Sequence, residues 1–520
     1  MPQYQLGEWL PDQPQIALPG LIEAKNVLPT ATGYTSFSSP INLAGVSALS
    51  NKCVGADSGT TQGGNIYTIA GSQSEIKVIW NSGDFADATP SGGITGFGSA
   101  SSQWEFEQYG DRLIALAPGV EPLSVDTEST GPGTSNRFSA ISPHASRATT
   151  CTVHKDFLIL GNVEGRGNNA SAIGTQKAGL HWSAIGDPTN WPTVATQSAI
   201  DVQSDFQVLD GSGGDITAII SAGDYVAVLR ERQVWRMDYV GGSAFFAFRK
   251  IDHSRGCMLP RTAVAVNGVV YFPSVEGFMA FDGARLYSIG EEKVDRTWRA
   301  TMDFDNTLHC CAAHNAETHS IYWTISSGSG LPSKIFGYRY DMERWFEVDD
   351  RETQWVLNTF ALNMGGNLDA TIANGGLSDQ NMDNYTENLD ALGADDSTSA
   401  MAIFDSSNKL AAYTDSADPL GGTIVTGDFE SPPPTRSVLG YIRPIYEGEG
   451  SVSGTAAGRV KPVDTVVYKP LTHVESTGVL AGVLSNRVGG RYLRAKFTTS
   501  GGSIENFSGF DAELRQVGTR

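Results

Sequence analysis

Short apolar or alternating stretches, each interrupted by a two-residue turn, recur through the middle of the chain. Five of them have the order strand, turn, strand, with turns that begin at Gly110, Lys155, Gly223, Asn267 and Glu317. The pair Asn267-Gly268 suits a type I′ turn, because both central residues of that turn need a positive φ. Each stretch therefore predicts a β-hairpin.

The hairpins recur about every 45 residues, with one longer step of about 68, and a period near 45 is that of a four-stranded propeller blade. The longer step coincides with polar, glycine-rich insertions near 161–170 and 201–214. A third strand rich in aromatic residues follows each hairpin and supplies bulk for packing between blades. We predict five blades from this repeat. The stretches 66–80 and 354–362 either add one blade each or together close the ring.

The two flanks of this repeat follow other patterns. The first 60 residues contain Pro11, Pro14, Pro19, Pro29 and Pro40 with little alternation, which is typical of an extended arm. Residues 363–425 are rich in Gly, Asn and Asp. They favour a solvated loop or insertion, with a functional acidic surface as the alternative.

After residue 425 the strand pattern returns. In the stretch 491–499, Leu493, Ala495 and Phe497 share one face while Arg494 and Lys496 share the other, as in a half-exposed strand. The predicted fold is therefore all-β: an extended N-terminal arm (1–60), a β-propeller (61–362), the acidic insertion (363–425) and an additional, sandwich-like C-terminal β domain (426–520).

Charge is unevenly placed along the chain. The formal net charge is −21, and residues 435–520 carry a net +4, which leaves −25 before them. Binding to nucleic acid requires Lys and Arg to displace phosphate counterions, so the chain as a whole is not expected to grip DNA or RNA. No run approaches the ~18 apolar residues of a membrane helix, and we expect a soluble protein.

Motifs that carry chemistry are scarce. The sequence contains no GK[ST], HExxH or GxSxG, which excludes a Walker A phosphate loop. The stretch 165–170 fits the dinucleotide-binding pattern only loosely, and we interpret it as an exposed inserted loop because no amphipathic helix follows. Among 57 acidic residues, the sequence does not single out a catalytic carboxylate pair. We expect no enzyme activity and no cofactor.

The five cysteines lack CxxC spacing, and we predict that they are reduced and buried. The best metal candidate is the group His309, Cys310, Cys311 and His314. Alternation along a strand places these side chains on opposite faces, so packed thiols are favoured over a structural zinc ion, and we expect no metal. Residues 303–305 (Asp-Phe-Asp) are predicted as a turn rather than a calcium site.

Three segments carry a resemblance to a protein family. The first begins Gly7-Glu8-Trp9-Leu10-Pro11-Asp12-Gln13-Pro14 and continues through Pro29 to Gly33-Tyr34. The second is Trp182-Ser183-Ala184-Ile185-Gly186-Asp187-Pro188-Thr189-Asn190-Trp191. The third runs from Thr426-Gly427-Asp428-Phe429-Glu430 through Arg443-Pro444 and Gly490-Arg491-Tyr492 to Gly509-Phe510-Asp511-Ala512-Glu513. In these segments the chain resembles the nozzle or tail-hub proteins of short-tailed bacteriophages (podophages), also called tail tubular protein B or packaged-DNA stabilisation proteins.

The resemblance implies a structural virion protein, made in the host cytoplasm and built into the phage tail. It implies a β-propeller with added β domains, in six copies that form a ring below the portal and adaptor, with tail fibre or spike proteins as further partners. Such a ring would retain packaged double-stranded DNA and pass it during ejection without sequence-specific binding.

Two residue sets follow, the first from the resemblance and the second from the uneven charge of the chain. Residues with an expected assembly or structural role are Trp9, Pro11, Pro14, Pro29, Gly33, Trp182, Asp187, Pro188 and Trp191. Candidates for an acidic channel or tip are Asp379, Asp383, Asp390, Asp395 and Asp396. The acidic stretch 363–420 and the run Pro432–Pro434 depart from the family pattern.

Two other classes of function remain open at this point. One is a glycan-binding propeller that acts as an adhesin, and the other, less favoured, is a propeller glycoside hydrolase. A lectin should repeat a ligand pocket from blade to blade, whereas a hydrolase should show one converging cluster of carboxylates.

Overall fold

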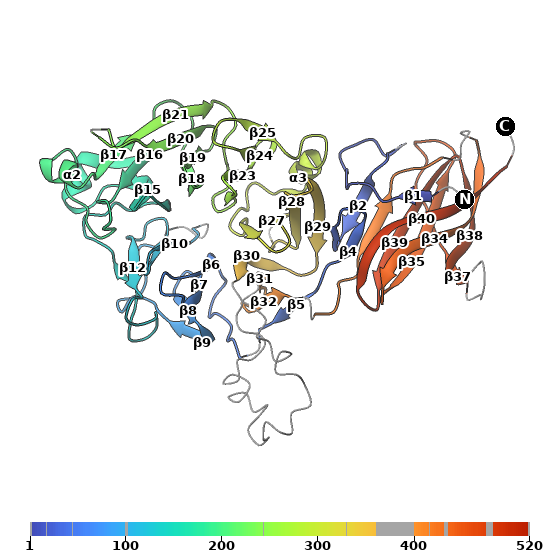
Figure 1. The fold of residues 1–520 in the computed structure, drawn as a ribbon, viewed down its shortest axis with the longest axis horizontal. Helices are drawn as coiled ribbons and strands as arrows, with labels where there is room; N and C mark the ends of the chain where they lie inside the picture. The colour runs from blue at the N-terminus through green and yellow to red at the C-terminus, as the bar shows by residue number, and fades with distance from the viewer. Residues whose placement is uncertain are drawn as a thin grey trace, which may run out of the picture.

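The computed structural model describes residues 3–517, except 17, 44, 99–101, 243, 329, 360–399, 415–416, 431–434 and 475–481. A ring of β-sheets occupies one end of the long axis and a second β unit occupies the other, where both chain termini lie (Figure 1). Its helices are short: α1 (Ala170–Ile173), α2 (Gln197–Asp201) and α3 (Asp295–Thr301). The predicted all-β class, the propeller and the extra C-terminal β unit are confirmed.

Six blades of the ring are separate four-stranded sheets. Five of them follow in chain order: β6 (Ala56–Thr60), β7 (Ile66–Gly71), β8 (Ile76–Trp80) and β9 (Ser82–Asp87); β10 (Glu105–Tyr109), β11 (Arg112–Leu116), β12 (Leu123–Asp126) and β13 (Ser139–Ala140); β14 (Thr150–His154), β15 (Phe157–Glu164), β16 (Thr175–Trp182) and β17 (Asp205–Val208); β18 (Ile216–Ser221), β19 (Val226–Arg230), β20 (Val234–Tyr239) and β21 (Phe246–Asp252); β22 (Val264–Val266), β23 (Val269–Ser274), β24 (Gly277–Phe281) and β25 (Leu286–Ser288).

The sixth separate blade joins the two ends of the ring. It pairs β30 (Thr353–Thr359), β31 (Ala400–Asp405) and β32 (Leu410–Tyr413) with β5 (Pro40–Asn42), which comes from the start of the chain. Its inner strand β30 contacts β6 of the first blade. Because this blade mixes strands from both sides of the repeat, the ring cannot open without breaking a sheet.

The five predicted hairpins are confirmed as the inner strand pairs of consecutive blades. Four are β10–β11, β14–β15, β18–β19 and β22–β23, and the fifth joins β26 (Ala312–Asn315) to β27 (Ser320–Ile325). Asn267 and Gly268 have φ values of 51° and 81°, as the predicted type I′ turn requires. Residues 66–80 form β7 and β8 of one blade and residues 354–359 lie in β30 of another, so each stretch adds its own blade.

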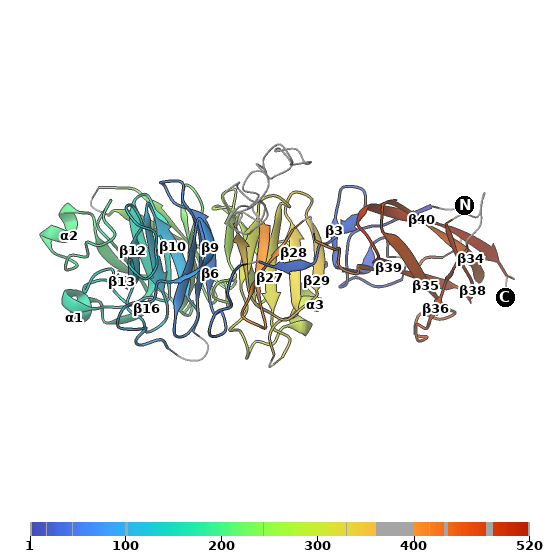
Figure 2. The ribbon, with the colours of Figure 1, turned by 90° about the horizontal axis from the view of Figure 1, so that it is seen from below.

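One continuous sheet connects the ring to the second β unit. It has nine strands in the order β26, β27, β28 (Lys334–Arg339), β29 (Arg344–Asp349), β2 (Leu21–Lys25), β33 (Thr423–Thr426), β39 (Tyr492–Ser500), β35 (Ser451–Arg459) and β36 (Tyr468–Pro470). The first four strands occupy a position in the ring, and β2 pairs with β29 on one side and with β33 on the other. Backbone pairing therefore joins the two units, which lie next to each other along the long axis (Figure 2).

A second sheet faces the C-terminal half of the nine-stranded one. Its order is β3 (Val27–Pro29), β4 (Tyr34–Ser36), β40 (Ile504–Gln516), β34 (Ser437–Gly448), β38 (Val483–Gly490) and β37 (Thr472–Val474), and β1 (Gln3–Gln5) also pairs with β40. Phe497 of one sheet packs on Phe507 and Phe510 of the other, with ring centroids 5.2 Å apart in both pairs. Alternating apolar residues on the two facing sheets form the core of a sandwich.

The structure draws different boundaries from those predicted for the flanks. Residues 1–60 do not form a separate arm, because their strands belong to both sheets of the sandwich and to two propeller blades. The segment 363–425 contains β31 and β32, whose mostly buried residues complete a blade, so it is not wholly a loop. Arg494 was predicted on a half-exposed face but is buried, because Asp428 pairs with it. Within the described residues, no helix is long and apolar enough to cross a membrane.

Candidate functional site in the propeller channel

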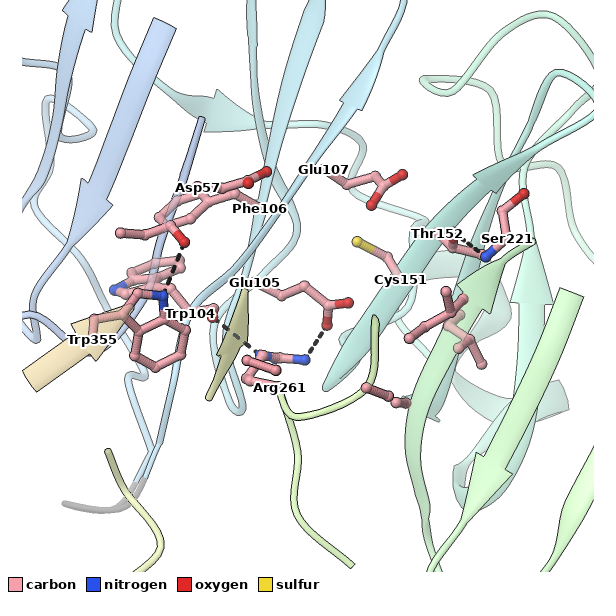
Figure 3. Close-up of a pocket in the computed structure, with 16 residues that line it drawn as sticks. Asp57, Trp104, Glu105, Phe106, Glu107, Cys151, Thr152, Ser221, Arg261 and Trp355 are labelled. Atoms are coloured by element: carbon pink, nitrogen blue, oxygen red, sulfur yellow. Dashed lines mark hydrogen bonds and ion pairs between the residues drawn. The ribbon is translucent and has the colours of Figure 1, made fainter. Parts of the chain in front are cut away.

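The central channel of the propeller contains a cavity of about 310 Å³. Its walls come from the inner strands β6, β10, β14, β18, β26 and β30 and from the residues just before β22. Figure 3 shows the polar side chains that line it, among them Asp57, Glu105, Glu107 and Arg261. The ring thus brings together residues that lie up to three hundred positions apart in the sequence.

Strand alternation explains why two of these acids face the channel. Glu105 and Glu107 are two residues apart on β10 and therefore share one face, while Phe106 between them packs in the core between blades. Phe106 stacks on Trp104 with ring centroids 6.0 Å apart. The packing of these aromatic residues fixes the position of β10, and the strand in turn directs the two carboxyl groups into the channel.

Arg261 holds one of the acids in place. Its guanidinium forms an ion pair with Glu105, while its Nη2 donates to the Thr149 carbonyl (2.6 Å) and its Nε to the Trp104 carbonyl (3.1 Å). The backbone of Arg261 is left-handed, with φ of 64°, which is costly for a residue with a side chain and is held here by these bonds. Thr150 Oγ1 also donates to Glu105 at 3.1 Å.

No cation in the described part of the chain forms an ion pair with the other two acids. Glu107 accepts a hydrogen bond from the backbone N–H of Val153 at 3.2 Å. Burial, reinforced by the charges of Glu105 and Asp57, raises the pKa of Glu107 to about 8. Burial, with a further contribution from Glu105, raises the pKa of Asp57 to about 6. Burial also raises the pKa of Glu105, although Arg261 opposes that effect.

This arrangement gives Glu107 and Asp57 different protonation states at neutral pH. Glu107 is mostly protonated and can donate a hydrogen bond, whereas Asp57 is mostly ionised and can accept one. Carboxyl groups whose environments push their pKa values apart are the usual components of acid–base pairs. Burial raises the pKa of the neighbouring Cys151 thiol, so this cysteine stays protonated and is a poor nucleophile.

A second cluster of buried charge lies where the start of the chain meets the sandwich. Asp428 is 2 % exposed and pairs with both Arg459 and Arg494. Arg494 donates to Asp428 Oδ1 through Nε at 2.9 Å and to Gln15 Oε1 through Nη2 at 2.8 Å. Each of these charged groups has a partner within the chain, which supports a structural role for the cluster.

The signature residues expected to have assembly or structural roles separate into two places. Trp9, Pro11, Pro14, Pro29 and Gly33 lie on the segment that joins the sandwich to the ring. Trp9 is buried and donates to the Ile22 carbonyl at 3.0 Å, and a side chain on Gly33 would collide with the backbone of Phe507.

The remaining signature residues lie in the blade of β14 to β17. Trp182 and Trp191 are each 2 % exposed, and Trp191 donates to the Pro188 carbonyl at 2.7 Å. Asp187 accepts from both the N–H and the hydroxyl group of Thr189, at 2.9 and 2.7 Å. These contacts shape a turn and its core, and none of the residues lines the channel cavity.

The histidine and cysteine candidates do not converge. All five cysteines are free and buried, as predicted, and Cys310 and Cys311 pack into different cores. His309 contacts the Gln354 carbonyl at 2.9 Å, and His314 contacts the Tyr340 hydroxyl at 3.2 Å. Asp303 accepts from the Asp305 N–H at 3.0 Å in the predicted turn.

The stretch 165–170 differs from the exposed loop that was predicted. It contains a turn of 3₁₀ helix and leads into α1, and Asn169 is fully buried. The Asn169 side chain donates to the carbonyls of His144 and Pro192, both at 3.2 Å. The glycines allow this close packing, and the segment serves the fold of its blade.

The candidates Asp379, Asp383, Asp390, Asp395 and Asp396 lie outside the described residues. Sequence reasoning missed Asp57, Glu105, Glu107 and Arg261. The signal for two of them was present, because Glu105 and Glu107 alternate on the first strand of a predicted hairpin, and first strands face the axis of a propeller.

Comparisons with known proteins address the fold alone. No family model matches the chain, and no curated protein matches it. Solved structures similar to it include one titled "YCF48 bound to D1 peptide", with 8% identity and a TM-score of 0.35 over 74% of this chain and 97% of that one. Another is titled "Structure of apo AztD from Citrobacter koseri", with 12% identity and a TM-score of 0.27 over 54% of this chain and 68% of that one.

Proposed function

We propose that this chain is a structural subunit of the tail nozzle or hub of a short-tailed phage, where several copies form a ring around the path of the genome. The observation that carries the proposal is the joint between the chain ends. The first and third segments of the family resemblance meet at this joint, where their strands share the sheets that connect the sandwich to the propeller.

Specific contacts support a mechanical role for that joint. β1 pairs with β40 through Tyr4 and Phe510, whose rings stack 5.2 Å apart. Gln15 from the first segment and Asp428 from the third bind the same arginine, Arg494. β2 lies in the interior of the sheet that the propeller and the sandwich share, and this continuity suits a static part of a large assembly.

In such a ring the genome would pass through the space that the copies enclose, and not through the channel of a single propeller. The channel cavity of about 310 Å³ is crossed by the Arg261–Glu105 ion pair and is far too small for a duplex. The large acidic excess before residue 435 would keep DNA from adhering to the ring. Proteins bind DNA when Lys and Arg replace the counterions of the phosphates, and carboxylates cannot do this. Screening limits this repulsion to carboxylates within roughly 8 Å of the DNA.

The deciding experiment is to locate the chain in a native particle. A C-terminal tag labelled with gold and viewed by electron microscopy should appear in a ring on the tail axis. Label on the capsid, or on fibres away from the axis, would contradict the proposal.

A second experiment addresses the acidic stretch. Replacing Asp379, Asp383, Asp390, Asp395 and Asp396 with Lys should slow genome ejection, and high salt should relieve the slowing. Ejection that is unchanged at every salt concentration would remove this stretch from the DNA path.

A second candidate function is recognition or cleavage of a glycan in the propeller channel. The convergence of Asp57, Glu105 and Glu107 favours it, because one carboxylate cluster is what a propeller hydrolase needs. A panel of chromogenic glycosides and a glycan-binding screen test it, with Glu107→Gln as the variant and Glu128→Gln, an exposed change, as the control. Turnover that Glu107→Gln abolishes would replace the structural proposal with an enzymatic one.

A further inference from the structure

Two exposed apolar patches lie on different units of the molecule, one on the sandwich and one at the outer end of the propeller. The first, here called the knob, is the loop 460–467 between β35 and β36. Val463 and Val467 in this loop are 88% and 65% exposed, more than any other large hydrophobic side chain in the described part of the chain. Exposure of such apolar side chains to water is unfavourable, and burial against a partner lowers the free energy.

The knob is ordered before any partner arrives. Asp464 accepts a hydrogen bond from the N–H of Lys461 at 2.8 Å, and Arg459 donates to the Pro462 carbonyl at 2.6 Å. Arg459 is itself anchored to the buried Asp428. A loop fixed in this way loses little conformational entropy on docking.

The second patch, here called the rim, lies at α2, the end of the propeller farthest from the sandwich (Figures 1 and 2). Its apolar members are Ile185, Ile200 and Val240, which are 42%, 52% and 56% exposed. The Ile185 N–H donates to the Val202 carbonyl at 3.0 Å, which fixes Ile185 beside the end of α2.

The rim reaches the neighbouring blade through a side-chain bond. Tyr239, next to Val240, donates to Gln203 Oε1 at 2.8 Å just after α2. The three apolar side chains therefore sit on one connected framework that spans two blades.

The two patches carry opposite charge. The exposed Lys461 and Lys469 outnumber the exposed Asp464 in and beside the knob, whereas Asp187 and Asp201 are exposed at the rim. The same division holds for the whole chain, since residues 435–520 are net basic and the rest is strongly acidic. Apolar surface with complementary charge favours association and sets its orientation.

We propose that the knob of one copy docks on the rim of the next copy of this chain. A head-to-tail contact of this kind is heterologous, and repetition closes into a ring when the rotation between copies allows it. The inference deepens the proposed ring and rests on it only in assuming that copies meet. An eight-residue loop covers little area, so the contact alone is weak and depends on salt.

The experiment uses the full chain and sedimentation velocity at low and high salt. The knob variant carries Lys461→Glu and Lys469→Glu, and the rim variant carries Gln197→Lys and Asp201→Lys. Each variant alone opposes like charges across the contact and should sediment as a monomer where the unmodified chain associates. An equimolar mixture restores opposite charges at every contact and should associate again.

Two controls separate the contact from the fold and from net charge. Lys52→Glu with Asp305→Lys changes exposed charges outside both patches and should leave association unchanged. Val463→Asp removes the tip of the knob at a site too exposed to affect folding, and it should weaken association at every salt concentration.

The outcomes distinguish this contact from the proposed function. Association that survives both charge variants, with rings still present in particles, overturns the contact and leaves the nozzle proposal intact. An unmodified chain that stays monomeric at every concentration and salt also overturns the contact, and the gold-label position in the particle then decides the nozzle proposal by itself. If each variant alone is monomeric and only their mixture associates, the result supports the knob and the rim as the two sides of one contact.

Discussion

The molecule holds two clusters of buried or half-buried charge, and they differ in how they are neutralised. At the joint, one carboxylate, Asp428, faces two guanidinium groups and an amide, and every one of these groups has a partner. In the channel, three carboxyl groups face a single guanidinium, that of Arg261. The first cluster binds the chain to itself, whereas the second leaves two of its three acids, Glu107 and Asp57, outside the ion pair and beside a cavity.

The difference follows from where each cluster sits. The joint is covered by strands from both ends of the chain, so an unpaired charge there would have no access to water. The channel lies on the axis of the ring, where only the inner strands approach one another and water can enter. A protein can keep excess acid in such a place because protonation of Glu107 relieves the repulsion.

The largest expected effect is that of removing the start of the chain. Deleting residues 1–34 takes β2 out of the nine-stranded sheet and removes Trp9 from the core. The free energy of unfolding should fall by more than the ~3–5 kcal/mol that a single buried tryptophan contributes. The single thermal unfolding transition should also split into one for the propeller and one for the sandwich. Calorimetry measures both the loss of stability and the number of transitions. Trp9→Ala, which removes one buried side chain and keeps β2, serves as a milder variant for comparison. One unchanged transition after the deletion would show that β2 does not couple the two units.

The next effect tests the joint cluster itself. Asp428→Asn leaves two buried guanidinium groups without their carboxylate and should cost about 3–5 kcal/mol in the free energy of unfolding. Chemical denaturation measures it, with Glu449→Gln, an exposed change in the same β unit, as the control.

A triple replacement sharpens the same point. Changing Asp428, Arg459 and Arg494 together to Leu, Met and Leu should cost less than Asp428→Asn alone, because no charge is then left unpaired. A triple variant that is less stable than the single one would mean that the ion pairs add net stability of their own.

The fold was largely predictable because its signals are local. The turn at Asn267-Gly268 and the regular spacing of the hairpins are properties of neighbouring residues, and they identified the inner strands of five blades. The sharing of strands was not predictable. β5 and β2 are short segments among prolines, and their partners lie more than three hundred residues away, so no pattern near them could reveal the pairing.

The candidate site was harder to predict for a related reason. Glu105 and Arg261 form an ion pair only because the ring places inner strands of different blades around one axis. Asp428 and Arg494 meet through the pairing of β33 with β39. Residue type marked all four as charged, and only the tertiary fold decides that they are buried together.

The channel cluster should reveal itself in the pH dependence of stability. The pKa of Glu107 is about 8 in the folded protein and about 4.3 in an unfolded chain, so the folded state binds an extra proton between these values. Stability contributed by this group is therefore lost as pH rises from about 4.3 to about 8.

Glu107→Gln removes that loss. The variant should be more stable than the unmodified chain at pH 8 by about 1 to 2 kcal/mol after screening by water in the channel, with little difference near pH 4. Denaturation across this pH range measures it, and Glu128→Gln, on the surface, should change nothing. If the free energy of unfolding of the two variants changes with pH by the same slope, Glu107 is ionised and solvated in the folded protein.

The smallest effect concerns a contact between the start of the chain and the propeller outside the shared sheet. Asp12 accepts from the N–H groups of Arg296 and Thr297, at 2.6 and 2.8 Å, and thus caps the first turn of α3 from a distant part of the sequence. Asp12→Ala leaves these donors to water and should cost about 1 kcal/mol, as the loss of a helix cap usually does, with Asp12→Asn costing less. Chemical denaturation of the full chain measures the difference, and Gln13→Ala next to it serves as the matched control. If Asp12→Ala is as stable as the unmodified chain, water replaces the cap without loss, and the start of the chain is held by β2 and the Asp428 cluster alone.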